Sequence, residues 1–168
     1  LQTIRQGKIG GGESHVLDLV RGINKNLFDP VVLSFTDGPM IDRLQEIGIK
    51  SYVIPSTTPF DIRLEKQVKK IILDENIDIL HAHGSRAMSN TFTAAKKAGI
   101  PVIYTVHGWS FHQDQSYPVR RLRELSEKLL TNKADRTICV SKSNEQDGIT
   151  RFNMKKSEVI YNGVDLQK

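Results

Sequence analysis

Cysteine is almost absent from this chain: Cys139 stands alone among 168 residues. A single cysteine cannot form an internal disulfide, so the sequence is not a disulfide-stapled scaffold, and a reducing cytoplasm is the expected setting. Cys139 lies in an apolar run, which suits a packed position within a strand. A nucleophilic thiol is the alternative interpretation of the same residue.

Long hydrophobic runs are also missing. No run approaches the roughly 20 apolar residues of a membrane-spanning helix, and no signal-peptide pattern is visible. Hydrophobic residues make up 38% and charged residues 26% of a chain whose length suits one domain, so the composition indicates a soluble globular protein. The opening segment Leu1–Ile4 resembles the interior of a strand, so we expect the natural start to lie upstream.

Aromatic side chains are few, at 7%, and the formal charge of +5 comes without an RNA-binding signature or a basic patch interleaved with aromatics. The sequence therefore argues against nucleic acid as a partner. Two interpretations of the positive charge stay open. It is either a solvated basic surface or a source of attraction to anionic lipid or a nucleotide diphosphate.

The chain does contain a regular alternation of short apolar runs with helical patterns. The runs, several of them rich in β-branched residues, are typical of buried parallel strands. They span residues 1–4, 31–35, 51–54, 77–80, 102–106 and 137–140, with a last short one at 159–161. The alternation predicts an α/β fold: a Rossmann-like, doubly wound parallel sheet with helices on both faces.

Three apolar stripes at helical spacing mark the faces expected to bury against that sheet. They comprise Val16, Leu17, Leu19, Val20 and Ile23; Leu64, Val68, Ile71 and Ile72; and Leu122, Leu125, Leu129 and Leu130. Two helix boundaries have chemical markers. Asp61 suits an N-cap before the second stripe, and Gly99 followed by Pro101 suits a helix stop.

The polar residues best suited to ligand binding come where the predicted strands end. Gly10–Glu13 follows the first strand, His81–Gly84 ends the fourth, His107–Trp109 ends the fifth and Ser141–Ser143 ends the sixth. The carboxyl ends of parallel strands share one edge of an open sheet, where ligands bind in such folds. This edge is therefore the predicted small-molecule site.

The triple glycine Gly10–Gly12 opens a predicted helix, where backbone N–H groups and the helix N-terminus favour an anion. Contact with a phosphate or a sugar ring is one interpretation, and a tight strand-to-helix turn is the other. A dinucleotide fingerprint matches poorly, because His15 stands where its third glycine belongs. Asp37 could still mimic the acidic residue of a nicotinamide enzyme, so that hypothesis stays open.

Three histidines accompany the glycines. His81 and His83 are two residues apart, so on a strand they face the same side, and His107 should lie at the end of a neighbouring strand. Imidazoles in this number can bind a metal, but no acidic ligand is placed to complete the set. Hydrogen-bonded structural histidines and contact with a polar ligand are the alternatives.

Aromatic and basic residues gather just after His107. Trp109, Phe111 and Tyr117 precede three arginines within residues 120–123. This combination suits a membrane interface or a lipid-linked acceptor. A loop that leads into a basic helix face is the alternative interpretation.

Five segments in order along nearly the whole chain resemble the motifs of glycosyltransferase family 4. The matching segments are Gly10–Glu13 (its GGxE start), Asp78–Gly84 (its D-hydrophobic-hydrophobic-H-x-H strand end), Thr105–Gly108 (its T-x-H-G segment), Cys139–Ser143 (its VS strand end) and Ile160–Asp165 (its I-x-N-G-V-D linker). Each motif alone is weak, but the ordered set is specific.

The resemblance implies a GT-B fold, in which two Rossmann-like domains face a cleft. It also implies retaining transfer of a sugar from a nucleotide-sugar donor to a glycan or lipid-linked acceptor. The family generally needs no bound metal, so we expect no cofactor. Residues 1–168 would form the N-terminal, acceptor-side domain and end at the linker to a C-terminal donor-binding domain. Without that second half, we expect no sugar transfer by this chain alone.

The resemblance also implies roles for individual residues. His107 matches the histidine beside the transferring sugar and is the expected catalytic residue. The expected donor- or acceptor-binding residues are Gly11, Gly12, Glu13, His83, Gly108 and Ser141. The expected hinge residues are Asn162, Gly163 and Asp165. One departure is the segment Arg5–Ile9, which is longer and more polar than a minimal turn before the glycines.

Two alternatives belong to other functional classes. One is a non-catalytic Rossmann-like ligand-binding module, and the other is a sugar-nucleotide epimerase of GT-B fold. For the transferase we expect a cytoplasmic location, with peripheral contact at the anionic inner face of the membrane.

Overall fold

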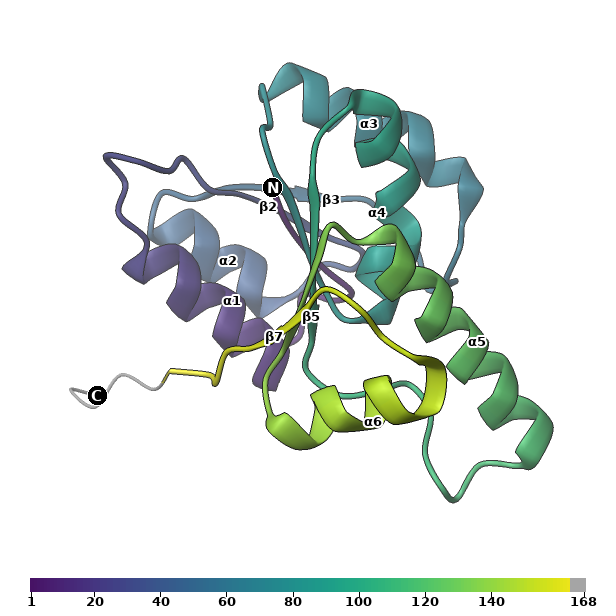
Figure 1. The fold of residues 1–168 in the computed structure, drawn as a ribbon. Coiled ribbons are helices and arrows are strands. Elements are labelled where there is room, and N and C mark those ends of the chain that lie inside the picture. The colour runs from purple at the N-terminus through teal and green to yellow at the C-terminus, as the bar shows by residue number, and fades with distance from the viewer. Residues whose placement is uncertain (164–168) are drawn as a thin grey trace.

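The computed structural model describes residues 1–163, which form one seven-stranded sheet flanked by helices (Figure 1). The strands are β1 (Gln2–Ile4), β2 (Val31–Ser34), β3 (Lys50–Val53), β4 (Leu80–His83), β5 (Val102–Val106), β6 (Arg136–Cys139) and β7 (Ser157–Val159). All pairings are parallel, and the order is β3-β2-β1-β4-β5-β6-β7. The direction of strand addition reverses between β1 and β4, as in Rossmann-like sheets. The predicted fold class is confirmed.

The helices cover both faces of the sheet. They are α1 (Gly11–Gly22), α2 (Pro39–Glu46), α3 (Glu65–Asp74), α4 (Ser85–Ala98), α5 (Tyr117–Lys133) and α6 (Lys142–Phe152), with a 3₁₀ turn η1 (Ile62–Leu64) before α3. In Figure 1, α1 and α2 lie together on one side, and α3 and α4 lie on the other. Right-handed crossovers require this division, because the strand order reverses between β1 and β4.

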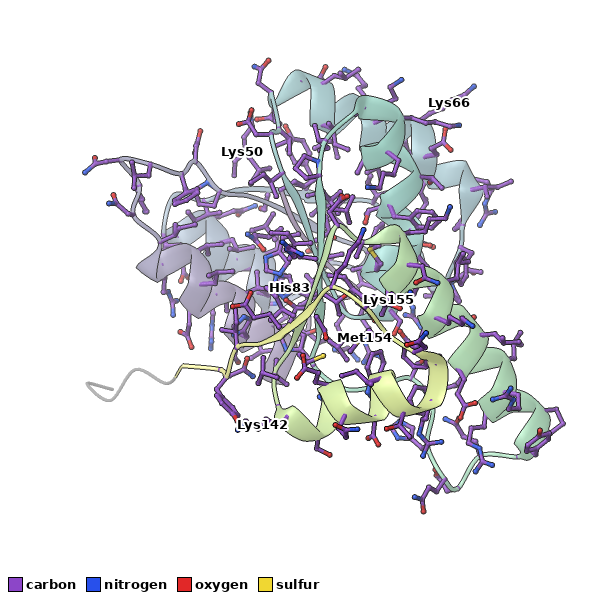
Figure 2. The ribbon with its side chains drawn as sticks, viewed as in Figure 1. Lys50, Lys66, His83, Lys142, Met154 and Lys155 are labelled. Carbon is purple, nitrogen blue, oxygen red and sulfur yellow. The ribbon has the colours of Figure 1, made fainter. Side chains whose placement is uncertain are left out.

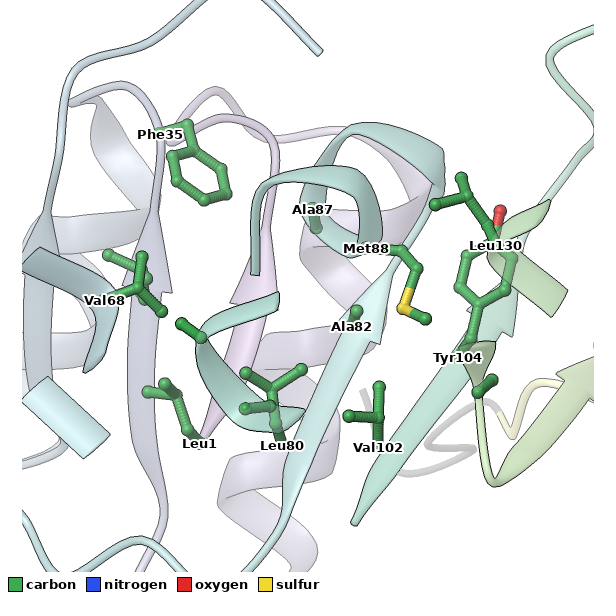
Figure 3. Close-up of a cluster of buried hydrophobic side chains, with 14 of the residues drawn as sticks. Leu1, Phe35, Val68, Leu80, Ala82, Ala87, Met88, Val102, Tyr104 and Leu130 are labelled. Atoms are coloured by element: carbon green, nitrogen blue, oxygen red, sulfur yellow. The ribbon is translucent and has the colours of Figure 1, made fainter. Parts of the chain in front are cut away.

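Each face has its own hydrophobic cluster. Val32 of β2 joins α1 and α2 in one cluster, whereas its neighbours Val31 and Leu33 join the opposite one. In the larger cluster, Leu80 and Tyr104 of the central strands lie with Met88 of α4 and Leu130 of α5 (Figure 3). Burial on both faces explains why these strands are short continuous apolar runs.

Two predicted strands are displaced along the chain. The fourth was expected at residues 77–80, but Ile77 N–H donates to the Ile72 carbonyl and closes α3, and β4 begins at Leu80. His81 and His83 therefore lie within β4. The last strand was expected at 159–161, but the pairing with β6 begins at Ser157 and ends at Val159.

Two predicted helix boundaries are confirmed. Asp61 accepts a hydrogen bond from Arg63 N–H at 3.2 Å and caps η1. Gly99 ends α4 in the left-handed conformation, with φ of 77°. The second stripe is buried as expected at Leu64, Val68, Ile71 and Ile72.

The prediction of which face of α5 is buried, made from the third stripe, is wrong. Leu122, Leu125 and Leu129 are 66%, 57% and 42% exposed, and of that stripe only Leu130 packs inside. The inward face instead carries Glu124 and Glu127. Both carboxylates have partners from distant segments, so their burial is compensated.

Candidate functional site

The polar edge predicted at the carboxyl ends of the strands exists. His83 ends β4, which pairs with both β1 and β5, and His107 directly follows β5. Gly12 in the first turn of α1 lies so close that a Cβ there would be 3.6 Å from His107 Cδ2. Figure 2 shows His83 near the middle of the molecule. The glycine loop and the two histidine segments therefore meet at one place.

Four histidines form one cluster at this edge. The His81 and His83 rings are 4.2 Å apart, which confirms that they face the same side of the strand. The His83 and His107 rings stack with centroids 5.4 Å apart. His15 of α1 completes the group, with its ring 5.2 Å from that of His107. Sequence reasoning treated His15 only as a missing glycine. The sequence did offer one signal for His15: it lies one turn after the glycines, at the start of the predicted helix that points toward the site.

The imidazoles are held by specific hydrogen bonds. His83 Nδ1 lies 3.1 Å from His107 Nε2, and His83 Nε2 lies 2.8 Å from Gln2 Oε1. His81 Nε2 lies 2.7 Å from Thr105 Oγ1. His83 is only 2% exposed, whereas His107 is half-buried at the open edge. The buried His83 therefore positions the His107 ring, and the partly exposed His107 is the histidine of this pair that a ligand can contact.

Burial keeps this cluster uncharged at neutral pH. Desolvation, with a smaller contribution from neighbouring imidazoles, lowers the pKa of His81 to about 3 and that of His107 to about 4. The same causes lower the pKa of His83 well below its usual range. Within residues 1–163, no three histidine, cysteine or acidic side chains are arranged to hold a metal ion. Neutral, hydrogen-bonded imidazoles are thus the chemistry that the described residues offer.

The glycine loop starts α1 as predicted. Gly10 is the N-cap, and Gly11 is exposed, with no atom beyond its chain neighbours and its own helix backbone within 4 Å of the position that a Cβ would take. The Glu13 side chain is buried and folds back, so that its Oε2 lies 2.8 Å from a Cβ placed on Gly10. Glu13 therefore lies against the helix start, and Gly11 leaves the peptide surface open to a ligand.

The longer segment Arg5–Ile9 is fixed against the end of β2. Gly7 N–H donates to Thr36 Oγ1 at 3.0 Å, and the Gly7 carbonyl accepts from Met40 N–H at 2.9 Å. A Cβ on Gly7 would lie 2.7 Å from Gly38 N, so the two glycine backbones pack directly together. Sequence reasoning missed this pair, because nothing local in the sequence indicates contact between residues 31 positions apart.

The other predicted site residues follow the ends of β5, β6 and β7. Gly108 is exposed directly after His107. Ser141 caps α6 by accepting a hydrogen bond from Asn144 N–H at 3.1 Å. Asn162 and Gly163 are exposed beyond β7, and Asp165 lies outside the described residues.

Two of the three aromatic residues after His107 are buried, contrary to the membrane hypothesis, whereas Tyr117 at the start of α5 is 67% exposed. Trp109 and Phe111 are each 6% exposed and stack on one another, with Phe152 edge-on to both rings. Trp109 Nε1–H also donates to the Asn144 carbonyl at 2.9 Å. The contacts of Trp109 and Phe111 with Phe152 therefore pack the loop after β5 against α6.

Cys139 is buried at the end of β6. Burial raises the pKa of its thiol to about 11, which keeps the sulfur protonated at neutral pH. Its environment supports the packing interpretation over the nucleophilic one.

The fold and the site together define a class of protein: a Rossmann-like domain with a polar, glycine-flanked ligand edge at the switch of strand order. The family model described as Glycosyltransferase Family 4 matches residues 9–168. This chain belongs to glycosyltransferase family 4.

Two relatives from Escherichia coli resemble it in sequence. One, named as a UDP-Gal:α-D-GlcNAc-diphosphoundecaprenol α-1,3-galactosyltransferase, is 30% identical over 150 residues, covering 84% of this chain and 38% of the relative. The O-antigen biosynthesis glycosyltransferase WbnH is 26% identical over 163 residues, covering 94% of this chain and 46% of the relative.

Solved structures share the fold. HepE from Anabaena, in complex with UDP, superposes with a TM-score of 0.79 at 22% identity, covering 99% of this chain and 44% of that protein. A protein from Listeria monocytogenes, described as a "putative UDP-N-acetylglucosamine 2-epimerase", superposes with a TM-score of 0.58 at 16% identity, covering 89% of this chain and 42% of that protein. The chain therefore spans less than half the length of each of these proteins.

Proposed function

We propose that this chain is the N-terminal, acceptor-side domain of a retaining glycosyltransferase, which moves a sugar from a nucleotide-sugar donor to a glycan or lipid-linked acceptor. The observation that carries the proposal is the placement of His107. Its neutral ring lies beside Gly12 at the open carboxyl edge of the sheet. Membership of glycosyltransferase family 4 supports the reaction class.

The geometry suggests how the residues would act. Gly11 and Gly12 leave the start of α1 bare, so backbone N–H groups and the helix N-terminus can approach the donor phosphate as it leaves. A retaining transfer builds positive charge on the sugar ring. His107 can hydrogen-bond a sugar hydroxyl, and its backbone carbonyl can face that charge. We propose no metal or other cofactor for this step.

The names of similar proteins support particular substrates. One relative is named for UDP-Gal and a GlcNAc-diphosphoundecaprenol, and HepE was solved with UDP and glucose. We infer a uridine diphosphate sugar as the donor and a lipid-linked sugar diphosphate as the acceptor. The epimerase of similar fold supplies the competing hypothesis, in which the sugar nucleotide itself is the product.

We also propose that the outer face of α5 contacts an anionic membrane surface. Leu122, Leu125 and Leu129 form an exposed stripe on the side of the helix opposite Glu124 and Glu127. Exposed cations on α5, among them Arg121, Lys128 and Lys133, lie close to the stripe in sequence. An apolar stripe flanked by cations matches the interface of an anionic bilayer. No helix in the described part of the chain has the length and apolar character needed to cross a bilayer.

A donor screen on the full-length enzyme that contains this chain tests the reaction class. Candidate nucleotide sugars are incubated with a lipid-linked sugar diphosphate, and both the nucleoside diphosphate and the sugar products are measured. Nucleoside diphosphate released in step with an extended acceptor is expected. Conversion of the donor into its epimer without acceptor extension would support the epimerase instead.

A further inference from the structure

A cavity of about 510 Å³ opens beside His83 and Gly108. Three arginines from separate parts of the chain line it: Arg5 in the loop after β1, Arg86 in the first turn of α4, and Arg123 in α5. Phe60 and Trp109 contribute apolar wall. The cavity thus joins the histidine site to a set of converging cations.

Within the part of the chain that the structure describes, no carboxylate forms an ion pair with these three arginines. Among the ion pairs of residues 1–163, none includes Arg5, Arg86 or Arg123, although Arg121 and Arg151 both pair with Glu124. Burial, followed by the like charge of Arg5, lowers the pKa of Arg86. Cations that line one cavity and form no ion pair create a positive potential that attracts an anion.

The nearby acid Glu127 forms no ion pair with them, because its two carboxylate oxygens accept hydrogen bonds from three hydroxyl groups. The Glu127 side chain is fully buried behind the cavity wall and accepts from Ser85 Oγ at 2.5 Å, Ser110 Oγ at 2.6 Å and Tyr104 OH at 2.9 Å. These bonds fix Ser85 and Ser110, which both line the cavity. Glu127 therefore shapes the wall and forms no ion pair with the three guanidinium groups, of which that of Arg123 also donates from Nη1 to the Ser110 carbonyl.

The N-terminus of α4 adds to the positive potential of the cavity. Its N-cap, Gly84, has φ of 81° and brings no side chain to cover the first turn. The helix is 14 residues long, and its N-terminus carries partial positive charge toward the cavity that Gly84, Ser85 and Arg86 line.

We propose that this cavity binds the diphosphate of the lipid-linked acceptor. Three cations suit a group with two adjacent phosphates, because guanidinium groups pair with phosphate oxygens in a bidentate manner. Gly12 approaches His107 from α1, whereas the arginine cavity is lined by its neighbours His83 and Gly108 and by residues of α4 and α5, which pack on the other face of the sheet. The two anion sites would thus flank His107, one for the donor phosphate and one for the acceptor diphosphate. This inference rests on the proposed transfer to a lipid-linked acceptor.

Calorimetric titration of the full-length enzyme tests the site without requiring turnover. The probes are a water-soluble, short-chain N-acetylglucosamine diphospholipid, the corresponding alkyl glycoside without phosphate, and UDP. Arg86→Met should weaken binding of the diphospholipid at least about tenfold, the loss expected for a charge-assisted hydrogen bond. Binding of the glycoside and of UDP should stay within about twofold. Arg123→Met should act in the same direction.

Arg43→Met is the matched control, because it removes the same charge from an exposed position on α2 that does not line this cavity. Equal diphospholipid affinity in the parent and in Arg86→Met would overturn the proposal, as would an equal loss in Arg43→Met. A loss of UDP affinity alone would assign the cavity to the donor and also overturn it. Normal transfer with unchanged diphospholipid binding in Arg86→Met would remove this subsite and leave the proposed function standing. Diphospholipid binding that depends on Arg86, in an enzyme that shows no sugar transfer, would support this subsite and contradict the proposed function.

Discussion

His107 Nε2 lies 3.1 Å from His83 Nδ1, so within the described residues this ring nitrogen already has a hydrogen-bond partner. His83 Nε2 lies 2.8 Å from Gln2 Oε1, which can only accept. With Gln2 Oε1 turned toward His83 Nε2, His83 carries its proton on Nε2 and accepts at Nδ1. His107 donates from Nε2, so its Nδ1 is left unprotonated and able to accept a hydrogen bond from a sugar hydroxyl.

Replacing Gln2 should remove the preference of His107 for this tautomer. Gln2→Leu removes the acceptor, so His83 no longer has to keep its proton on Nε2 and His107 should populate both neutral forms. The ¹⁵N chemical shifts of the His107 ring measure this directly, because protonated and bare nitrogens resonate far apart. Gln67→Leu, at an exposed position on α3, is the control and should leave the shifts unchanged. Identical His107 shifts in Gln2→Leu and the parent would remove the positioning role of Gln2.

The histidine cluster should make the fold sensitive to acid. The pKa of His81 is lowered to about 3 in the folded state, whereas an unfolded histidine titrates near 6.5. Between these values the unfolded chain binds more protons than the folded chain. The free energy of unfolding should therefore fall as the pH drops below about 6.5, and the loss should continue toward the folded pKa.

Chemical denaturation between about pH 4.5 and 7.5 measures this slope. His81→Gln should flatten it, whatever its effect on stability at pH 7. His112→Gln, at an exposed histidine, should leave it unchanged. The same slope in His81→Gln and in the parent would mean that His81 is not a buried neutral group.

Much of this architecture can be predicted from the sequence, because local patterns carry it. The bounds of β5 match its apolar run, and the segments at Gly12, His83 and His107 meet as the topology requires. The errors came from long-range partners. From the sequence, Glu124 and Trp109 are expected at the surface. In the structure, Glu124 is buried in an ion pair with Arg151, and Trp109 is buried against Phe152. Neither contact leaves a periodic signal in the sequence.

The outward leucines of α5 should determine binding to anionic vesicles. Changing Leu122, Leu125 and Leu129 together to Ser removes apolar area that would enter the bilayer interface, at roughly 25 cal/mol for each Å² lost. Co-sedimentation with phosphatidylglycerol vesicles should fall several-fold. The control changes three exposed apolar residues elsewhere to Ser: Leu27, Ile62 and Leu73. Equal sedimentation of the two triple variants would contradict the proposed membrane face.

The central claim is that His107 serves the transferring sugar. In the full-length enzyme, His107→Ala should lower kcat about a hundredfold or more, because losing a hydrogen bond that strengthens in the transition state costs roughly 2–4 kcal/mol. The donor KM should change less. Thermal unfolding of the variant should stay cooperative, since His107 is half-buried at an open edge. The decisive measurement is the steady-state kcat of His107→Ala. A hundredfold loss in a folded enzyme is predicted, and a near-normal kcat would contradict the account.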